Sequence, residues 1–422
     1  MLLAFFSVIS VLLGIFRDRL LAMYVGVGPT LDVYNASFRI PDLVYGILFS
    51  FVSAVTVVPF LTKAVHEKDS HSITKRFNSL FFFFVISIIA ISLIVIALLP
   101  FLSKYIVPGF DASQRESFVF FSSVMMLQPL LLGISALISC LSQVKHRFIL
   151  YSLAPLAYTV SIILSIVFLY KLYGLNGIIF GVIAGALLSL LVQSVSLFKE
   201  RVSISYKYFD WDLIKDHFKN ASPRSGSVIT SRLRDVVYVS FATLFGAGAL
   251  TIYIFAQKVM DVFIQVVVQS IATASLPSLA KHHSIGEVKE FKKLFSTNLI
   301  LVFFVSCVAT AVCFFASDFI VLVLYGHVAR FEEVSRFIVL LAVNLPFYAI
   351  NTYFVSAFNA TKDGFGLFLA NLVSTISALI ALFIFKEKGY GLESLIYSTW
   401  VLGVAYLLAL LFLYRSKIQH YK

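Results

Sequence analysis

Apolar runs of about 20 residues, the length that spans a bilayer as an α-helix, follow one another along nearly the whole 422-residue chain. Each run must be helical, because lipid offers no partner for a free backbone amide. Hydrophobic residues make up 60% of the chain and charged residues 13%, which excludes a soluble domain. We predict an all-α multi-pass membrane protein with about twelve transmembrane helices, at 2–25, 32–61, 77–101, 116–142, 148–170, 174–198, 222–245, 249–280, 291–316, 333–360, 364–385 and 392–414.

The net charge of +12 has a topological cause, so no nucleic-acid partner is expected. Basic residues collect in alternate loops, which the positive-inside rule places in the cytoplasm. These loops hold Lys63, Lys68, Lys75, Arg76, Lys145, Arg147, Lys199, Arg201, Lys207, Lys215, Lys219, Arg224, Lys281, Lys289, Lys292, Lys293, Lys362, Arg415, Lys417 and Lys422. We expect the first run to be a retained helix, because no basic segment precedes it and no cleavage site follows it. Both termini are then predicted to be cytoplasmic.

Intramembrane charges and helix-breaking glycines recur in both halves of the chain. The first half carries Arg17, Asp18, Gly26, Gly28, Arg39 and Asp42, and the second carries Arg234, Asp235, Gly246, Gly248, Lys258 and Asp261 at nearly constant offset. Six helices per half predict two lobes of the same orientation, related by a pseudo-two-fold axis along the membrane normal. We predict an N-lobe at 1–198, a cytoplasmic interfacial linker at 199–221, a C-lobe at 222–422 and a central cavity between the lobes.

Polar side chains on one face of these helices are expected to line the cavity. An ionised residue at the bilayer centre costs about 2.5–3.5 kcal/mol, so several together need partners or a function. The cations predicted to bind an anionic substrate are Arg17, Arg19, Arg39, Arg232, Arg234 and Lys258. The predicted polar and acidic partners are Asp18, Asp32, Asn35, Asp42, Asp235, Gln257 and Asp261.

Two interpretations of these charges stay open from the residues alone. In the first, carboxylates spaced i,i+3 neutralise the cations within their own helices, as in Arg39 with Asp42, Arg232 with Asp235 and Lys258 with Asp261. In the second, positive charge is in surplus, because Arg17 and Arg19 flank the single Asp18, and Asp235 is shared in the same way. Guanidinium groups bind phosphate bidentately, so the surplus favours a diphosphate head group.

The sequence predicts moving parts and no catalytic machinery. Residues that would let the lobes rock are Gly14, Gly26, Gly28, Pro41, Gly246 and Gly248. The sequence has no Gly-rich phosphate loop, nucleophile elbow or His-Glu metal motif. We expect no enzyme activity, no metal and no cofactor, and transport driven by an ion gradient or the membrane potential.

Several motifs in order resemble the MurJ (MviN) family of lipid II flippases, within the multidrug/oligosaccharidyl-lipid/polysaccharide (MOP) exporter superfamily. The motifs are Leu13-Gly14-Ile15-Phe16-Arg17-Asp18, Gly26-x-Gly28-x-x-x-Asp32 and Ser37-Phe38-Arg39-Ile40-Pro41-Asp42-Leu43. The resemblance implies a two-lobed, MATE-like alternating-access fold whose cationic cavity takes the diphosphate of an undecaprenyl-linked precursor. Arg17, Asp18, Asp32 and Arg39 match the family by position.

Other positions depart from the family pattern. The family usually has Arg at the positions of Val11 and Lys258, an Arg pair at Tyr45-Gly46, and Glu-Gly at Ser50-Phe51. Compensation by Arg19, Arg232 and Arg234 is a hypothesis that single substitutions test. Most members have fourteen helices, the last two helping to form a lipid-tail groove, so the tail site of this chain is unassigned.

The function expected from residues and resemblance is flipping of a polyprenyl-diphosphate-linked glycan, lipid II first among them. The expected location is the bacterial plasma membrane, and the expected partners are the lipid substrate, the bilayer and cell-wall synthesis enzymes. The alternatives are a flippase for polysaccharide or O-antigen precursors, a MATE-like exporter, and a non-transporting membrane scaffold. The positive surplus argues against an exporter of cations.

Overall fold

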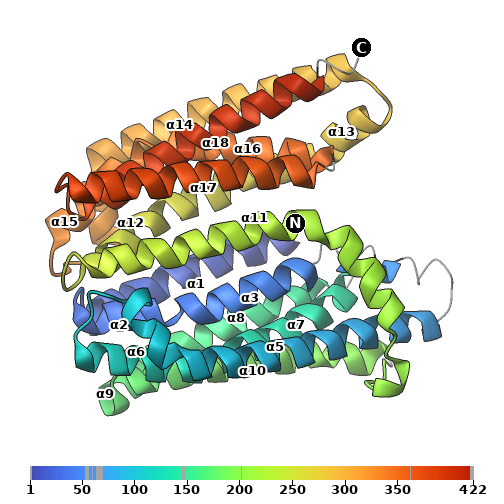
Figure 1. The fold of residues 1–422 in the computed structure, drawn as a ribbon, viewed down its shortest axis with the longest axis horizontal. Coiled ribbons are helices and arrows are strands. Elements are labelled where there is room, and N and C mark those ends of the chain that lie inside the picture. Colours follow the sequence, from blue (N-terminus) through green and yellow to red (C-terminus); the bar gives the residue numbers. More distant parts are fainter. Residues whose placement is uncertain are drawn as a thin grey trace. The chain divides into compact units, whose positions relative to one another are not determined.

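A computed structural model describes residues 2–52, 57–58, 60–62, 70–144, 148–200, 202–361 and 363–418, and no β-strand occurs among them. The predicted all-α class is therefore confirmed. Contacts divide the chain into two compact units, Met1–Ser240 and Phe241–Lys422, and each is described by itself (Figure 1). The lobe and linker boundaries at 198 and 222 stay a prediction.

The first unit holds twelve helical elements in the described residues, including a π-helical turn (η1) and a 3-10 turn (η2). They are α1 (Leu2–Tyr24), α2 (Pro29–Ser37), α3 (Arg39–Val52), α5 (Ser70–Ile106), α6 (Ala112–Met125), α7 (Leu127–Val144), α8 (Phe148–Leu164), η1 (Ser165–Leu169), α9 (Tyr170–Tyr173), α10 (Leu175–Glu200), η2 (Tyr206–Tyr208) and α11 (Trp211–Thr243). The last residues of α11, from Phe241 on, belong to the second unit.

The second unit is built from α12 (Ala249–Phe263), a π-helical turn η3 (Ile264–Val268), α13 (Gln269–Ser284), α14 (Val288–Tyr325), α15 (Phe331–Ala342), α16 (Leu345–Ala360), α17 (Gly364–Glu387) and α18 (Glu393–Ile418). In this unit α17 packs against α18, and α14 packs against α15 and α16.

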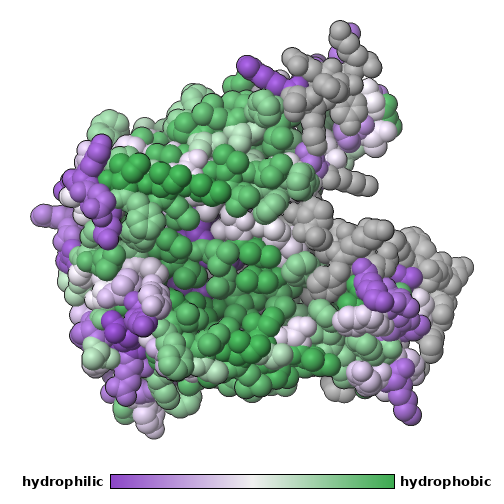
Figure 2. All heavy atoms as spheres, in the orientation of Figure 1, coloured by the Kyte–Doolittle hydropathy of each residue, from purple (hydrophilic) through white to green (hydrophobic). Residues whose placement is uncertain are grey.

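Every apolar run that we predicted to be helical falls on helix in the described residues. Eight helical stretches of the described residues are long and apolar enough to cross a membrane, or nine if α15 and α16, bent by 52°, form one span. Three of the eight join successive elements: α6 with α7, α8 with η1 and α9, and α12 with η3 and α13. The count of twelve spans stays a prediction. On the face in Figure 2, hydrophobic side chains cover the middle of each unit and hydrophilic ones gather at its ends, as expected for a bilayer-spanning protein.

Two of the predicted runs are interrupted by helix breaks next to prolines. Run 32–61 breaks at Phe38, before Pro41, and run 116–142 breaks at Met126, before Pro129. A proline ring clashes with the carbonyl four residues earlier and cannot donate a hydrogen bond, so each helix restarts with its proline in the first turn. The break between α15 and α16 repeats this arrangement in the second unit, with Pro346 in the first turn of α16.

Other local features also recur at the offset of the sequence repeat. Helices α5 and α14, of 37 and 38 residues, correspond to each other. Gly174 and Gly391 have nearly the same left-handed φ, 57° and 58°, a conformation that glycine adopts without strain. The local structure thus carries the internal repeat, whereas the pseudo-two-fold axis stays a prediction.

Helices α10 and α8 pack closely against each other in the first unit. Gly177, Gly181 and Gly185 recur every four residues on α10, and small residues at this spacing let helix backbones approach. A Cβ atom on Gly185 would lie 2.7 Å from the carbonyl oxygen of Tyr158, and Ser161 Oγ donates to the Gly181 carbonyl at 2.9 Å. Helix α8 also packs against α1.

The segment between α10 and α11 is attached to α5 by two fully buried polar residues, Asn78 and Ser79. Asn78 Nδ2 donates to the Ser203 carbonyl at 2.9 Å, and the Asp210 amide donates to Ser79 Oγ at 2.9 Å. Lys75 Nζ lies 2.6 Å from Asp210 Oδ2, and this hydrogen bond lowers the pKa of the Asp210 carboxyl. Within the predicted linker 199–221, α11 begins at Trp211 and continues to Thr243.

Candidate anion-binding site

Arg17 on α1 is paired with its own neighbour in the chain. Its Nε and Nη2 atoms both donate to Oδ1 of the buried Asp18, at 3.0 and 2.9 Å. Tyr34 on α2 and Tyr158 on α8 are further electrostatic neighbours of Arg17. Arg17 is therefore largely compensated by its own helix, and Arg19 lies half-buried on the same helix.

Arg39 is the first residue of α3, directly after the helix break at Phe38. Its Nε atom is buried and has no hydrogen-bond partner among the described residues. Asp42, one turn later, is its electrostatic partner, and Asp32 and Asn35 are buried on the preceding helix α2. A buried donor without an acceptor costs about 1–3 kcal/mol, so an anionic ligand oxygen at Arg39 would remove that cost.

On α11, Arg232 and Arg234 share the carboxylate of Asp235. The closest atoms are 4.0 Å apart for Arg232 Nη1 with Asp235 Oδ2, and 3.6 Å apart for Arg234 Nη2 with Asp235 Oδ1. The predicted i,i+3 pair of Arg232 with Asp235 is therefore confirmed, at the outer limit of an ion pair. One carboxylate serving two guanidinium groups leaves positive charge available to a ligand.

These charges meet at Asp42, whose electrostatic neighbours are Arg39, Arg232, Asp235 and Arg17, in decreasing order of their effect. We call these five residues the Asp42 cluster. Helices α1, α3 and α11 supply it, all within the first unit. Only tertiary packing brings α11 to this place, and the sequence signal for it is the matched position of its charges in the repeat.

The other predicted residues, Gln257, Lys258 and Asp261, lie on α12 in the second unit. Gln257 and Lys258 are half-buried, Asp261 is exposed, and Tyr348 Oη donates to Asp261 Oδ1 at 3.4 Å. The convergence of Lys258 with the arginines in one chamber stays a prediction.

The predicted hinge residues differ in backbone conformation. Gly26, Gly246 and Gly248 have φ angles of 80°, 92° and 82°, which favour glycine, and they form the turns after α1 and α11. Gly28 is extended, and Gly14 is helical with no heavy atom within 4 Å of an added Cβ. The backbone therefore requires glycine at three of these positions.

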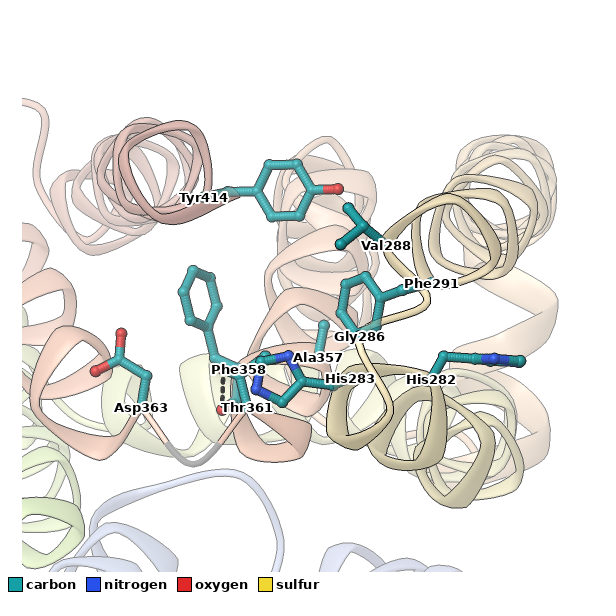
Figure 3. A pocket seen from close by; sticks show the side chains of 10 residues that line it. All are labelled: His282, His283, Gly286, Val288, Phe291, Ala357, Phe358, Thr361, Asp363 and Tyr414. Carbon is teal, nitrogen blue, oxygen red and sulfur yellow. Dashed lines mark hydrogen bonds between the residues drawn. The ribbon is translucent and has the colours of Figure 1, made fainter. Parts of the chain in front are cut away.

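The second unit contains a separate cavity of about 110 Å³ near the α13–α14 turn. Figure 3 shows the side chains of Phe291, Phe358 and Tyr414 around this space, with His283 at its edge. The residues that line it include none of those predicted to bind the substrate.

Residues 21–422 match the sequence model of the family described as "Lipid II flippase MurJ". The chain belongs to the MurJ family. Its MurJ relatives include a protein of Treponema pallidum (strain Nichols) described as "Probable lipid II flippase MurJ", which is 24% identical over 397 residues, or 90% of this chain and 74% of the relative. A protein of Aquifex aeolicus with the same description is 25% identical over 412 residues, or 94% of this chain and 80% of the relative.

Solved structures show that the MurJ fold and the MATE fold are both similar to this one. The structure described as "Lipid II flippase MurJ, inward closed conformation" has a TM-score of 0.83 at 20% identity and covers 98% of this chain and 87% of its own. An inward-facing MATE transporter of the MOP superfamily has a TM-score of 0.84 at 14% identity, and the match covers 98% of this chain and 95% of the transporter. The expected MOP-type fold is confirmed.

Proposed function

We propose that this MurJ-family protein moves lipid II, a polyprenyl-diphosphate-linked glycan, from the inner to the outer leaflet by alternating access. The observation that carries the proposal is the buried, unpartnered Nε of Arg39, which shares Asp42 as an electrostatic neighbour with Arg232. Guanidinium groups donate in a planar fork that matches phosphate oxygens. The diphosphate would complete the Asp42 cluster, and family membership supports lipid II as its carrier.

The residues of the cluster have different proposed roles. Arg39 and Arg232 would contact the diphosphate, because their donors are the least satisfied by described residues. Arg17 would set the local potential, since Asp18 already accepts from two of its nitrogens. Lys258, on α12 of the second unit, is proposed as a further cation for the substrate.

The proposed location is the bacterial plasma membrane, with both termini in the cytoplasm, where lipid II precursors are assembled. A membrane potential or an ion gradient would drive the cycle, and cell-wall synthesis enzymes would consume the product. Fusions of a reporter enzyme to each terminus test the topology, and activity of either fusion on the outer side would contradict it.

The decisive experiment is translocation of fluorescent lipid II by purified protein in liposomes. We expect Arg17→Ala and Arg39→Ala to abolish translocation while leaving expression intact. Arg336→Ala is the matched control, because Arg336 pairs with Glu393 at the protein surface and its side chain is 68% exposed. Full complementation of a flippase-deficient strain by both cluster variants would overturn the proposal. A scaffold would instead show no translocation in the wild-type protein.

A further inference from the structure

Gly46 on α3 lies against the side chain of Arg232 on α11. A Cβ atom added to Gly46 would lie 2.9 Å from Nε, 3.0 Å from Cγ and 3.3 Å from Cδ of Arg232. Cβ atoms in proteins essentially never come within 3.0 Å of such atoms. Gly46 is helical, so its φ angle does not require glycine. The space that it leaves is filled by the aliphatic stem of the arginine.

This contact fixes the stem of Arg232 and leaves its head group largely available. The nearest carboxylate oxygen, on Asp235, is 4.0 Å from Nη1, and no hydrogen bond joins the guanidinium to another described residue. The side chain is 43% exposed. Asp42, one turn before Gly46 on α3, attracts the guanidinium without a close contact. The direction of Arg232 is therefore set by packing on Gly46.

We infer that Gly46 is a positioning residue for anion recognition, acting through Arg232. The absent side chain lets Arg232 of α11 lie against α3, where Arg232 and Arg39 are both electrostatic neighbours of Asp42. Two guanidinium groups held in this way would bind the two phosphates of a diphosphate. The inference rests on the proposed function only in taking the anion to be the diphosphate of the lipid substrate.

Gly46→Ala tests the inference, and Gly14→Ala is its matched control for binding. Both glycines are helical and lie in the first unit, but a Cβ on Gly14 meets no heavy atom within 4 Å. Alanine is the better helix former, so Gly14→Ala should not lower the melting temperature. The melting temperature of Gly46→Ala is measured as well, because its Cβ would displace the side chain of Arg232. The measurement is the thermal shift that inorganic pyrophosphate causes in the purified, detergent-solubilised protein.

We expect Gly46→Ala to weaken pyrophosphate binding about tenfold, as for a disturbed charge-assisted hydrogen bond, and Gly14→Ala to leave it unchanged. In an Arg232→Ala background Gly46→Ala should add nothing, because residues that act through one contact are not additive. Arg232→Gln keeps the Cβ and Cγ methylenes of the stem but loses the charge, so it should weaken binding with little change in the melting temperature. If Gly46→Ala does not fold, pyrophosphate binding by Arg232→Gln tests the inference in its place.

Three outcomes overturn the inference: an equal effect of the two glycine variants, an additive effect of Gly46→Ala in the Arg232→Ala background, or undiminished binding by Arg232→Gln. A wild-type protein with no pyrophosphate shift also overturns it. Lipid II translocation is measured in parallel. If pyrophosphate binding depends on Gly46 and Arg232 but the wild-type protein does not move lipid II, the inference stands and the proposed function fails.

Discussion

The segment that carries Arg39 and Asp42 corresponds in the repeat to the one that carries Lys258 and Asp261, but the two have different backbones. In the first unit the helix breaks at Phe38, and Arg39 begins α3. In the second, α12 continues unbroken from Ala249 to Phe263, and a π-helical turn follows the charged residues. Pro41 accounts for the difference, because Met260 occupies the matching position and keeps its backbone hydrogen bond.

The surroundings of the two acidic residues differ accordingly. Asp42 is surrounded by charges from α1, α3 and α11, whereas the exposed Asp261 accepts from the hydroxyl of Tyr348. Matched charges in a duplicated chain are therefore not equivalent sites. The broken segment presents a donor that needs an acceptor, and we expect the larger share of anion recognition from the first unit.

Arg39→Ala should have the largest effect, because it removes the buried donor at the helix break. We expect lipid II translocation in liposomes to fall below detection. Arg39→Lys should recover a small part, because it restores the charge and not the planar fork. If Arg39→Ala translocated lipid II at the wild-type rate, the Arg39 segment would not differ in function from the Lys258 segment.

Pro41→Ala should have the next largest effect, because it lets α2 and α3 join as one helix and moves Arg39. Proline inside a helix costs about 3 kcal/mol or more, so healing the break should raise or preserve the melting temperature while translocation falls. Thermal unfolding and transport are measured on the same preparation. A parallel fall of both would mean that Pro41 acts through stability alone.

Lys258→Ala should reduce translocation by a smaller factor than Arg39→Ala, since Lys258 lies in a regular helix. Lys258→Arg should keep or raise the rate, because it adds donors at the same position. Initial rates at several lipid II densities in the vesicles check both. If Lys258→Ala lost more translocation than Arg39→Ala, the larger share of anion recognition would belong to the second unit and not to the first.

Tyr348→Phe should have the smallest effect. It removes one hydrogen bond of 3.4 Å to an exposed carboxylate, and a bond this long is weak. We expect less than about a twofold change in rate, within the range of a weak hydrogen bond. A severe loss of translocation would show that the hydrogen bond from Tyr348 to Asp261 is needed for transport, and would contradict the smaller part given to the second unit.

Much of the fold could be predicted because it depends on local patterns. Apolar runs specify helices in lipid, and the i,i+3 spacing of Arg232 and Asp235 places both on one helix face, where they meet. The helix break between α2 and α3 lies beside Pro41, whereas the role of Pro41 as a hinge stays a prediction. The family motifs around Arg17 and Arg39 also indicated the family that the whole-chain comparison shows.

The sequence by itself thus determined helices, repeat and family, because these depend on residues near one another in the chain or on their order. Only the tertiary structure decided that Arg232 crosses to Gly46 and that Arg39 Nε lacks an acceptor among the described residues. Such contacts join helices far apart in sequence. They follow from how closely backbones approach, which no local spacing encodes.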